Sequence, residues 1–331
     1  MAGRVERQEY ERRRGALACT FVATALSVAP VTAAENGIGF YLLGSRGPMA
    51  GFLPPPGFYL QNDMYFYEGS GGGQRIFSAG GRLLVDVNSK AQTDLMTGTW
   101  VLPGDVLGGN LAFGAIVPAG HVAVSAGATV AAPRLDAVVS RDLYDSAWQF
   151  GDPVLSSTLG WHSGDFHWNV TGLLNVPIGA YDENGLANLS FHRWAGDLSL
   201  ALTWFNPEIG IDLSGVVGIT FNGTNGLTNY TTGTEFHVEW AATKAFSKQW
   251  SAGVIGFHYQ QITGDSGEGA NLGAYKGRVT ALGGTVAYSF NAGNTPVTTR
   301  LKIFREFDVG NRMQGTAGYL TVSFPVSMAS N

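Results

Sequence analysis

The feature that most constrains the fold is a run of alternating residues at 234–245. Glu235, His237 and Glu239 fall on one side of an extended chain, whereas Phe236 and Trp240 fall on the other. Because successive side chains of a β-strand point to opposite faces, this strand would have one polar and one apolar face. The same period of two recurs at 165–176, 197–204, 208–221, 278–291 and 314–326. The pattern therefore belongs to the whole architecture.

The composition indicates where such strands are stable. Charged residues make up 14% of the chain, below the roughly 25% usual for soluble domains, while glycine reaches 47 residues and aromatics 12%. In lipid every backbone N–H and C=O needs a partner, and a closed barrel is the only sheet without unpaired edges. Helical spans of about 20 apolar residues are approached only at the N-terminus. The sequence predicts an all-β, transmembrane antiparallel β-barrel in a bacterial outer membrane.

The number of strands follows from the alternating segments and a parity rule. Bacterial single-chain barrels have even strand numbers, so we expect 12 strands in preference to 14, with 93–102 the weakest segment. The candidate segments are 58–67, 81–90, 93–102, 110–127, 154–162, 165–176, 196–205, 208–221, 234–246, 249–263, 277–291, 297–308 and 314–326. Short connections suit periplasmic turns, and longer polar ones suit the outer surface.

Residues 1–34 have the pattern of an export signal peptide. Five arginines precede an apolar run that ends on small residues, which predicts cleavage after Ala33 or Ala34. The chain's one cysteine, Cys19, lies in this run, so the mature protein would have neither disulfides nor cysteine metal sites. Loss of a basic leader from a chain of net charge −5 makes the remainder more acidic, which argues against nucleic-acid binding.

Two segments depart from the strand pattern. Residues 35–57 are rich in glycine and end in Pro54, Pro55 and Pro56, which excludes a central strand. Because this segment also carries many apolar side chains, it needs a dry location, either inside the barrel as a plug or packed at its rim. The apolar residues of 133–148 recur near a period of 3.6, which predicts a short helix outside the 58–331 barrel or across its mouth.

Polar residues on the inward faces of the strands are the candidates for a solute channel. One interpretation is that a small barrel filled by its own side chains pairs acids with bases. The other is a selectivity site, in which tyrosine rings face a ring-shaped solute and Asp63 orients its polar group. The candidates are Tyr59, Asp63, Tyr65, Tyr67, Asp86, His167, Glu235, His237, Glu239, Arg300 and Lys302.

Outward aromatic side chains predict contact with outer-membrane lipids. They would anchor the barrel at the two membrane interfaces. The set is Phe166, Trp168, Trp204, Phe221, Trp240, Phe257, Tyr288 and Phe324. Phe324 belongs to an apolar-aromatic last strand similar to those that engage the barrel-assembly machinery.

Catalytic and metal chemistry find little support. His162 and Ser163 are adjacent and so point to opposite faces, while His121 and Ser125 stand about 13 Å apart along one strand. Neither pair forms the hydrogen-bonded dyad of a barrel lipid hydrolase. Glu235, His237 and Glu239 lie two residues apart along one strand, so neighbouring side chains are about 7 Å from one another. This distance is too large for all three to chelate one ion tightly. We expect no catalytic residues, metal or cofactor.

The mature sequence resembles outer-membrane proteins associated with the meta-pathway of phenol degradation. The resemblance rests on Glu35-Asn36-Gly37, Pro54-Pro55-Pro56-Gly57, Leu107-Gly108-Gly109-Asn110, Phe150-Gly151-Asp152-Pro153 and Asn175-Val176-Pro177-Ile178-Gly179. It implies a monomeric barrel that moves small, often aromatic or otherwise hydrophobic, compounds into the periplasm. Passive or facilitated uptake of such a solute is therefore the expected function. A small general-diffusion porin and a structural barrel are the alternatives, and a lipid hydrolase is a more distant one.

Overall fold

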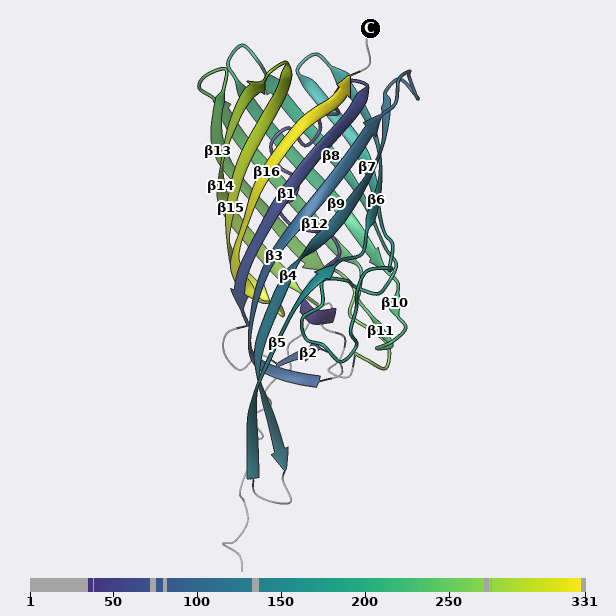
Figure 1. Ribbon diagram of the computed structural model, residues 1–331, viewed down its shortest axis with the longest axis vertical. Coiled ribbons are helices and arrows are strands. Elements are labelled where there is room, and N and C mark those ends of the chain that lie inside the picture. Colours follow the sequence, from purple (N-terminus) through teal and green to yellow (C-terminus); the bar gives the residue numbers. More distant parts are fainter. Residues whose placement is uncertain are drawn as a thin grey trace, which may run out of the picture.

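The computed structural model describes residues 35–37, 39–71, 76–79, 82–132, 137–270, 274 and 276–328. The signal peptide expected at 1–34 lies outside these residues. Figure 1 shows a barrel of tilted strands, with β4 and β5 extending well beyond one end. In the described part of the chain, no helix is both long enough and apolar enough to cross a membrane.

Twelve antiparallel strands close the barrel among the described residues. The ring is closed because β1 pairs with both β3 and β16, and β3 pairs with β4. The barrel strands are β1 (Gly57–Ser70), β3 (Arg82–Val101), β4 (Asn110–Ala132), β6 (Val154–Ser163), β7 (Phe166–Asn175), β8 (Ala195–Asn206), β9 (Ile211–Asn222), β12 (Glu235–Ala245), β13 (Trp250–Gln261), β14 (Arg278–Ala292), β15 (Thr295–Gly310) and β16 (Gln314–Met328).

The structure confirms the predicted barrel and its strand number. The extra segment in the sequence prediction arose because 81–90 and 93–102 form one continuous strand, β3. In the middle of β3 the outward side chains, such as Lys90 and Gln92, are polar and exposed. Polar residues on the face expected to be apolar look like a turn in sequence, although here the strand continues without a break.

The helix predicted at 133–148 is wrong, because β5 (Ala137–Phe150) occupies this region. β4 pairs with β6 as far as Ile116 and then with β5 from Ala119 onward. Exposed Tyr144, Trp148 and Phe150 lie on one face of β5, which is the period of a strand. The shorter elements are β2 (Ile76–Ala79), which pairs with β3, the pair β10 (Thr224–Asn225) and β11 (Tyr230–Thr231), and the 3-10 turn η1 (Glu35–Gly37).

The two ends of the barrel differ in their connections. The β6–β7, β8–β9, β12–β13 and β14–β15 turns are short and lie at the end where β1 begins and β16 ends. The connections at 176–194, 223–234 and 262–277 are longer and lie at the end where β4 and β5 protrude (Figure 1). Since short turns are periplasmic in such barrels, we assign the end with the short turns to the periplasm.

Candidate functional site

A non-strand segment, residues 39–56, passes through the barrel between η1 and the start of β1, and we call it the lumen segment. Wall side chains accept hydrogen bonds from its backbone: Gly44 N donates to Glu239 Oε1 at 2.8 Å, and Gly51 N donates to Thr203 Oγ1 at 2.8 Å. Lys302 Nζ donates to the carbonyl oxygens of Gly44 and Ser45, at 2.6 and 2.7 Å. Buried backbone groups without secondary structure thus find partners on the barrel wall.

The apolar side chains of the lumen segment form the largest cluster of buried residues with one side of the barrel. Tyr41 and Leu43 pack in this cluster with Phe257, Phe304 and Tyr319. The Tyr41 ring also stacks on His237, with centroids 3.6 Å apart. His237 Nε2 in turn lies 2.9 Å from Asp197 Oδ2. This part of the lumen segment therefore packs against β12, β13, β15 and β16.

A buried polar network holds η1, which precedes the lumen segment. The Glu35 carboxylate accepts hydrogen bonds from Thr228 Oγ1 at 2.6 Å and from Asn225 Nδ2 at 3.2 Å, and Arg193 Nη1 lies 3.6 Å away. Tyr181 contributes its hydroxyl to the same group. Burial, reinforced by the charge of Glu35, raises the pKa of Tyr181, so this hydroxyl stays protonated and can donate.

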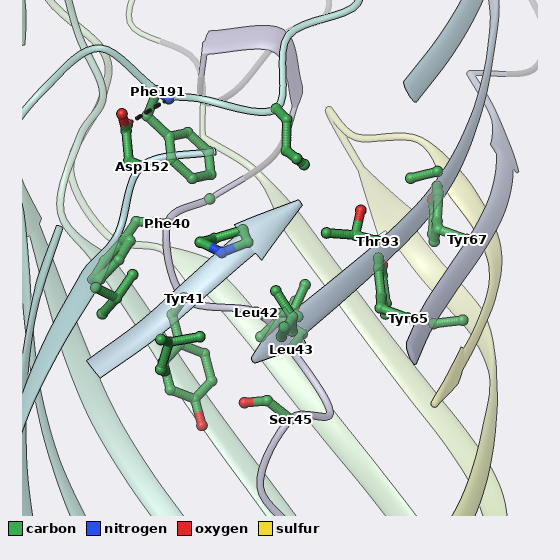
Figure 2. Close-up of a pocket in the computed structure, with 18 of the residues that line it drawn as sticks. Phe40, Tyr41, Leu42, Leu43, Ser45, Tyr65, Tyr67, Thr93, Asp152 and Phe191 are labelled. Atoms are coloured by element: carbon green, nitrogen blue, oxygen red, sulfur yellow. Dashed lines mark hydrogen bonds between the residues drawn. The ribbon is translucent and has the colours of Figure 1, made fainter. Parts of the chain in front are cut away.

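A cavity of about 330 Å³ lies between the lumen segment and the wall on the side of β1, β3, β4 and β6. Figure 2 shows Leu42 and Leu43 of the segment facing Tyr65, Tyr67 and Thr93 of the wall. Most of the lining is apolar. The larger apolar lining residues are Phe40, Leu42, Leu43, Leu95, Ile116, Pro118, Val122, Val154, Leu173, Leu189, Phe191, Phe257 and Met313, together with the rings of Tyr41, Tyr65 and Tyr67.

The 176–194 connection covers the outer side of this cavity through Leu189 and Phe191. Asp152 holds it in place, because its carboxylate accepts hydrogen bonds from the backbone of Gly179 at 2.9 Å and Phe191 at 2.8 Å. The second of these bonds is the dashed line in Figure 2. Asp152 also accepts a hydrogen bond from Asn175 Nδ2 at 3.0 Å.

We expect Asp152→Ala to loosen the 176–194 connection without unfolding the barrel. The change leaves several backbone N–H groups without an acceptor, which costs about 1–3 kcal/mol per buried group. Limited proteolysis of the purified barrel should then cut this connection at least about tenfold faster. Asp182→Ala is the control, because the Asp182 carboxylate accepts a hydrogen bond from Asn184 N within the connection itself. Equal cutting of both variants would contradict the role of Asp152.

The structure brings only some of the predicted site residues together. Asp63, Tyr65 and Tyr67 line the cavity. Glu235, His237, Glu239, Arg300 and Lys302 lie on the strands that the lumen segment packs against, and several of them hold it. Glu235 accepts a hydrogen bond from Tyr259 at 2.6 Å, and Arg300 approaches Thr285 at 3.5 Å.

Three other predicted residues lie away from the cavity. The Tyr59 hydroxyl donates to Pro55 O at the periplasmic rim, and His167 contacts the Phe52 ring at 5.1 Å near the same end. The inward placement of Asp86 is wrong, because Asp86 is exposed and the buried Val87 faces inward instead. At this end of β3 the exposed outer face carries polar side chains, so polarity no longer marks the lumen.

The prediction of which face of β13 points inward is wrong. Phe257 was expected to face lipid, yet it is buried inside the barrel and packs against Phe304, with centroids 5.2 Å apart. The lumen is apolar here because the lumen segment covers it. Sequence reasoning did not identify the cavity residues of the 176–194 connection, Leu189 and Phe191, because no periodicity marks a connection. Thr93 and Leu95 were missed because their strand seemed weak.

The fold and the sequence both have relatives. The COG4313 outer membrane channel from Pseudomonas putida F1 is similar in structure, with a TM-score of 0.62 and 15% identity over 82% of this chain and 96% of that one. A FadL homologue of Pseudomonas aeruginosa has a TM-score of 0.42 and 12% identity over 89% and 97% of the two chains. No curated protein matches the chain. Residues 73–322 match the family model described as "Putative MetA-pathway of phenol degradation".

Proposed function

This chain belongs to the family described as "Putative MetA-pathway of phenol degradation", and we propose that it is a channel for passive uptake of small hydrophobic or aromatic compounds. It is an outer-membrane β-barrel with the fold of an outer membrane channel. The observation that carries the proposal is the cavity of about 330 Å³, lined by leucine, valine and tyrosine side chains inside the barrel. Pockets for small molecules begin at about 300 Å³ and are mostly apolar.

The lumen segment favours this function over general diffusion. An open porin needs a continuous water-filled lumen. Here the lumen segment lies inside the barrel, where its backbone at Gly44 and Gly51 is hydrogen-bonded to the wall and Tyr41 and Leu43 pack in a buried cluster with it. A purely structural barrel, in turn, would gain stability if this apolar space were filled. The retained cavity therefore supports a solute-binding role.

We expect Ala91→Trp to block uptake, because Ala91 lines the cavity opposite Tyr67 and a Trp side chain there would fill much of it. Uptake of toluene and of sucrose would be compared in vesicles whose outer leaflet is lipopolysaccharide, which slows unaided entry. The barrel should speed toluene entry at least about tenfold over empty vesicles, and the variant should abolish most of this gain. Ala115→Trp, on the lipid-facing side of β4, is the matched control.

The comparison with sucrose separates the alternatives. Equal acceleration of toluene and sucrose would favour a small general-diffusion porin. Acceleration of neither compound would remove the proposed channel function and leave the structural interpretation. Toluene uptake that Ala91→Trp leaves unchanged would show that the cavity is not the route.

A further inference from the structure

The cavity has two chemically different sides. Leu42, Leu43, Ile116 and Leu173 face it from the lumen segment, β4 and β7. On β3 the inward positions Ser89, Thr93 and Thr97 instead place a hydroxyl group at every fourth residue, and all three line the cavity. The apolar side suits a hydrocarbon ring, and the hydroxyl side suits a polar substituent.

Two of the hydroxyl groups on this side are adjacent and available. Tyr65 lies directly opposite Thr93 in the β1–β3 register, and both side chains face the cavity. Figure 2 shows them side by side on the neighbouring strands. The Tyr67 hydroxyl, by contrast, donates to Glu306 Oε2 at 3.0 Å. Among the hydrogen bonds of the described residues, none involves the Tyr65 or the Thr93 side-chain hydroxyl.

A pair of hydroxyl groups can bind one polar atom in more than one way. Each can donate or accept, so together they suit the hydroxyl group of an alcohol or phenol. The Tyr65 ring adds an aromatic face that is supported from behind by Tyr319, with centroids 4.9 Å apart. A single-ring solute could therefore rest on this ring while its polar group meets Thr93.

The charges around the cavity oppose a negatively charged solute. Four carboxylates line it, and each already accepts hydrogen bonds from the protein: Glu35, Asp63, Asp152 and Glu306. Asp63 is two residues from Tyr65 on the same inward face, and it accepts from Gln61 Nε2 at 2.6 Å and Thr321 Oγ1 at 2.5 Å. An anion at the hydroxyl pair would face this negative charge in a medium that screens it weakly.

The cations near the cavity have other partners. Arg46 Nη2 donates to Ala50 O at 2.8 Å and Asn169 Oδ1 at 3.0 Å. The Arg312 guanidinium lies over the Tyr259 ring at 4.2 Å. Lys302 is buried, bonds to the two carbonyl groups of the lumen segment and does not line the cavity. Acids therefore outnumber bases on the lining.

From these observations we propose that the cavity accepts its solute in the uncharged form, with the solute's single polar group bound by Tyr65 and Thr93. This inference rests on the proposed uptake of small aromatic compounds. It names the favoured class as neutral one-ring compounds that carry one hydroxyl group, and it excludes the corresponding carboxylate anions. Tyr65 and Thr93 are the specificity-determining residues, and Asp63 contributes to the exclusion.

The test compares three ligands of similar size on the barrel in nanodiscs at pH 7, with empty nanodiscs as the blank. Toluene has no polar group, benzyl alcohol has a neutral one, and benzoate is an anion. Saturation-transfer NMR titrations should give an apparent affinity for benzyl alcohol at least about tenfold higher than for benzoate. Equal affinity for these two ligands would overturn the exclusion of anions.

Two variants that preserve shape test the hydroxyl pair. Tyr65→Phe and Thr93→Val should each weaken benzyl alcohol binding by about threefold to tenfold, and leave toluene binding unchanged. Asp63→Asn should raise benzoate binding. Loss of toluene and benzyl alcohol binding in equal proportion would mean that the variants damage the cavity, and it would overturn the assignment. If the wild-type barrel binds none of the three ligands, the proposed function fails together with this inference.

Discussion

Replacing Gly44 with alanine is expected to detach the middle of the lumen segment from the wall and widen the pore. Gly44 has a φ of +83°, a conformation that residues with a Cβ rarely adopt. A Cβ atom there would also lie 2.7 Å from Cε2 of Phe304, a buried ring held in the main apolar cluster. Backbone strain and steric overlap act together, so the segment cannot keep both its hydrogen bonds and its packing.

The measurement is single-channel conductance in planar bilayers. Conductance should rise several-fold in Gly44→Ala. Sucrose should enter vesicles that contain this variant, whereas it should not enter vesicles that contain the wild-type barrel. Gly47→Ala is a close control on the same segment, because no left-handed φ is required there and the nearest atom would be 3.9 Å away. Unchanged conductance in Gly44→Ala would mean that the lumen segment does not limit the pore.

The barrel could be predicted from the sequence because lipid imposes one rule on every strand. Apolar side chains must alternate with polar ones wherever the outer face meets lipid and the inner face meets water. Tyr65, which was predicted on the inner face, lines the cavity, and its neighbour Met64 is exposed on the outer face. Together with the even strand number of bacterial single-chain barrels, the rule gave twelve strands, although it could not show that 81–90 and 93–102 are one strand.

The same rule failed wherever the outer face of a strand does not meet lipid or its inner face does not meet water. On β13 the inner face meets the apolar lumen segment, so Phe257 is inside and the polar His258 is on the other face. At Asp86 the outer face meets water, so an acid is exposed there. Neither change of surroundings can be recognised from the neighbouring residues in the sequence, because one depends on what fills the barrel and the other on how far the strand extends.

The cavity itself was only half predictable. Alternation placed Asp63, Tyr65 and Tyr67 on the inner face, and they do line the cavity. It also placed Glu239 and Lys302 inside. It could not show that they contact the lumen segment at Gly44, which is 195 residues from Glu239 and 258 residues from Lys302 in the sequence. Charges that were candidates for solute contact are instead bonded to the lumen segment. Periodicity identifies a face and gives no information about its partner.

Lys302→Met is expected to cause the largest loss of stability among the wall variants, about 3 kcal/mol in the free energy of unfolding. Lys302 and Glu239 are both buried, and they bond to the carbonyl oxygen and the N–H of the same residue, Gly44. Removing the ammonium leaves the Glu239 carboxylate buried without its compensating charge. Urea unfolding of the barrel in detergent micelles, followed by tryptophan fluorescence, would measure the change.

The double variant Lys302→Met/Glu239→Gln should recover most of this loss, because the glutamine keeps a hydrogen-bond acceptor for Gly44 N and carries no charge. Lys90→Met is the control: Lys90 pairs with Glu68 at 2.8 Å on the exposed outer surface, where ion pairs contribute less than about 1 kcal/mol. A double variant as unstable as the sum of its single changes would refute the coupling. Recovery would instead show that the two charges act together to hold the lumen segment at Gly44. This is the same residue at which Gly44→Ala is expected to detach the segment from the wall.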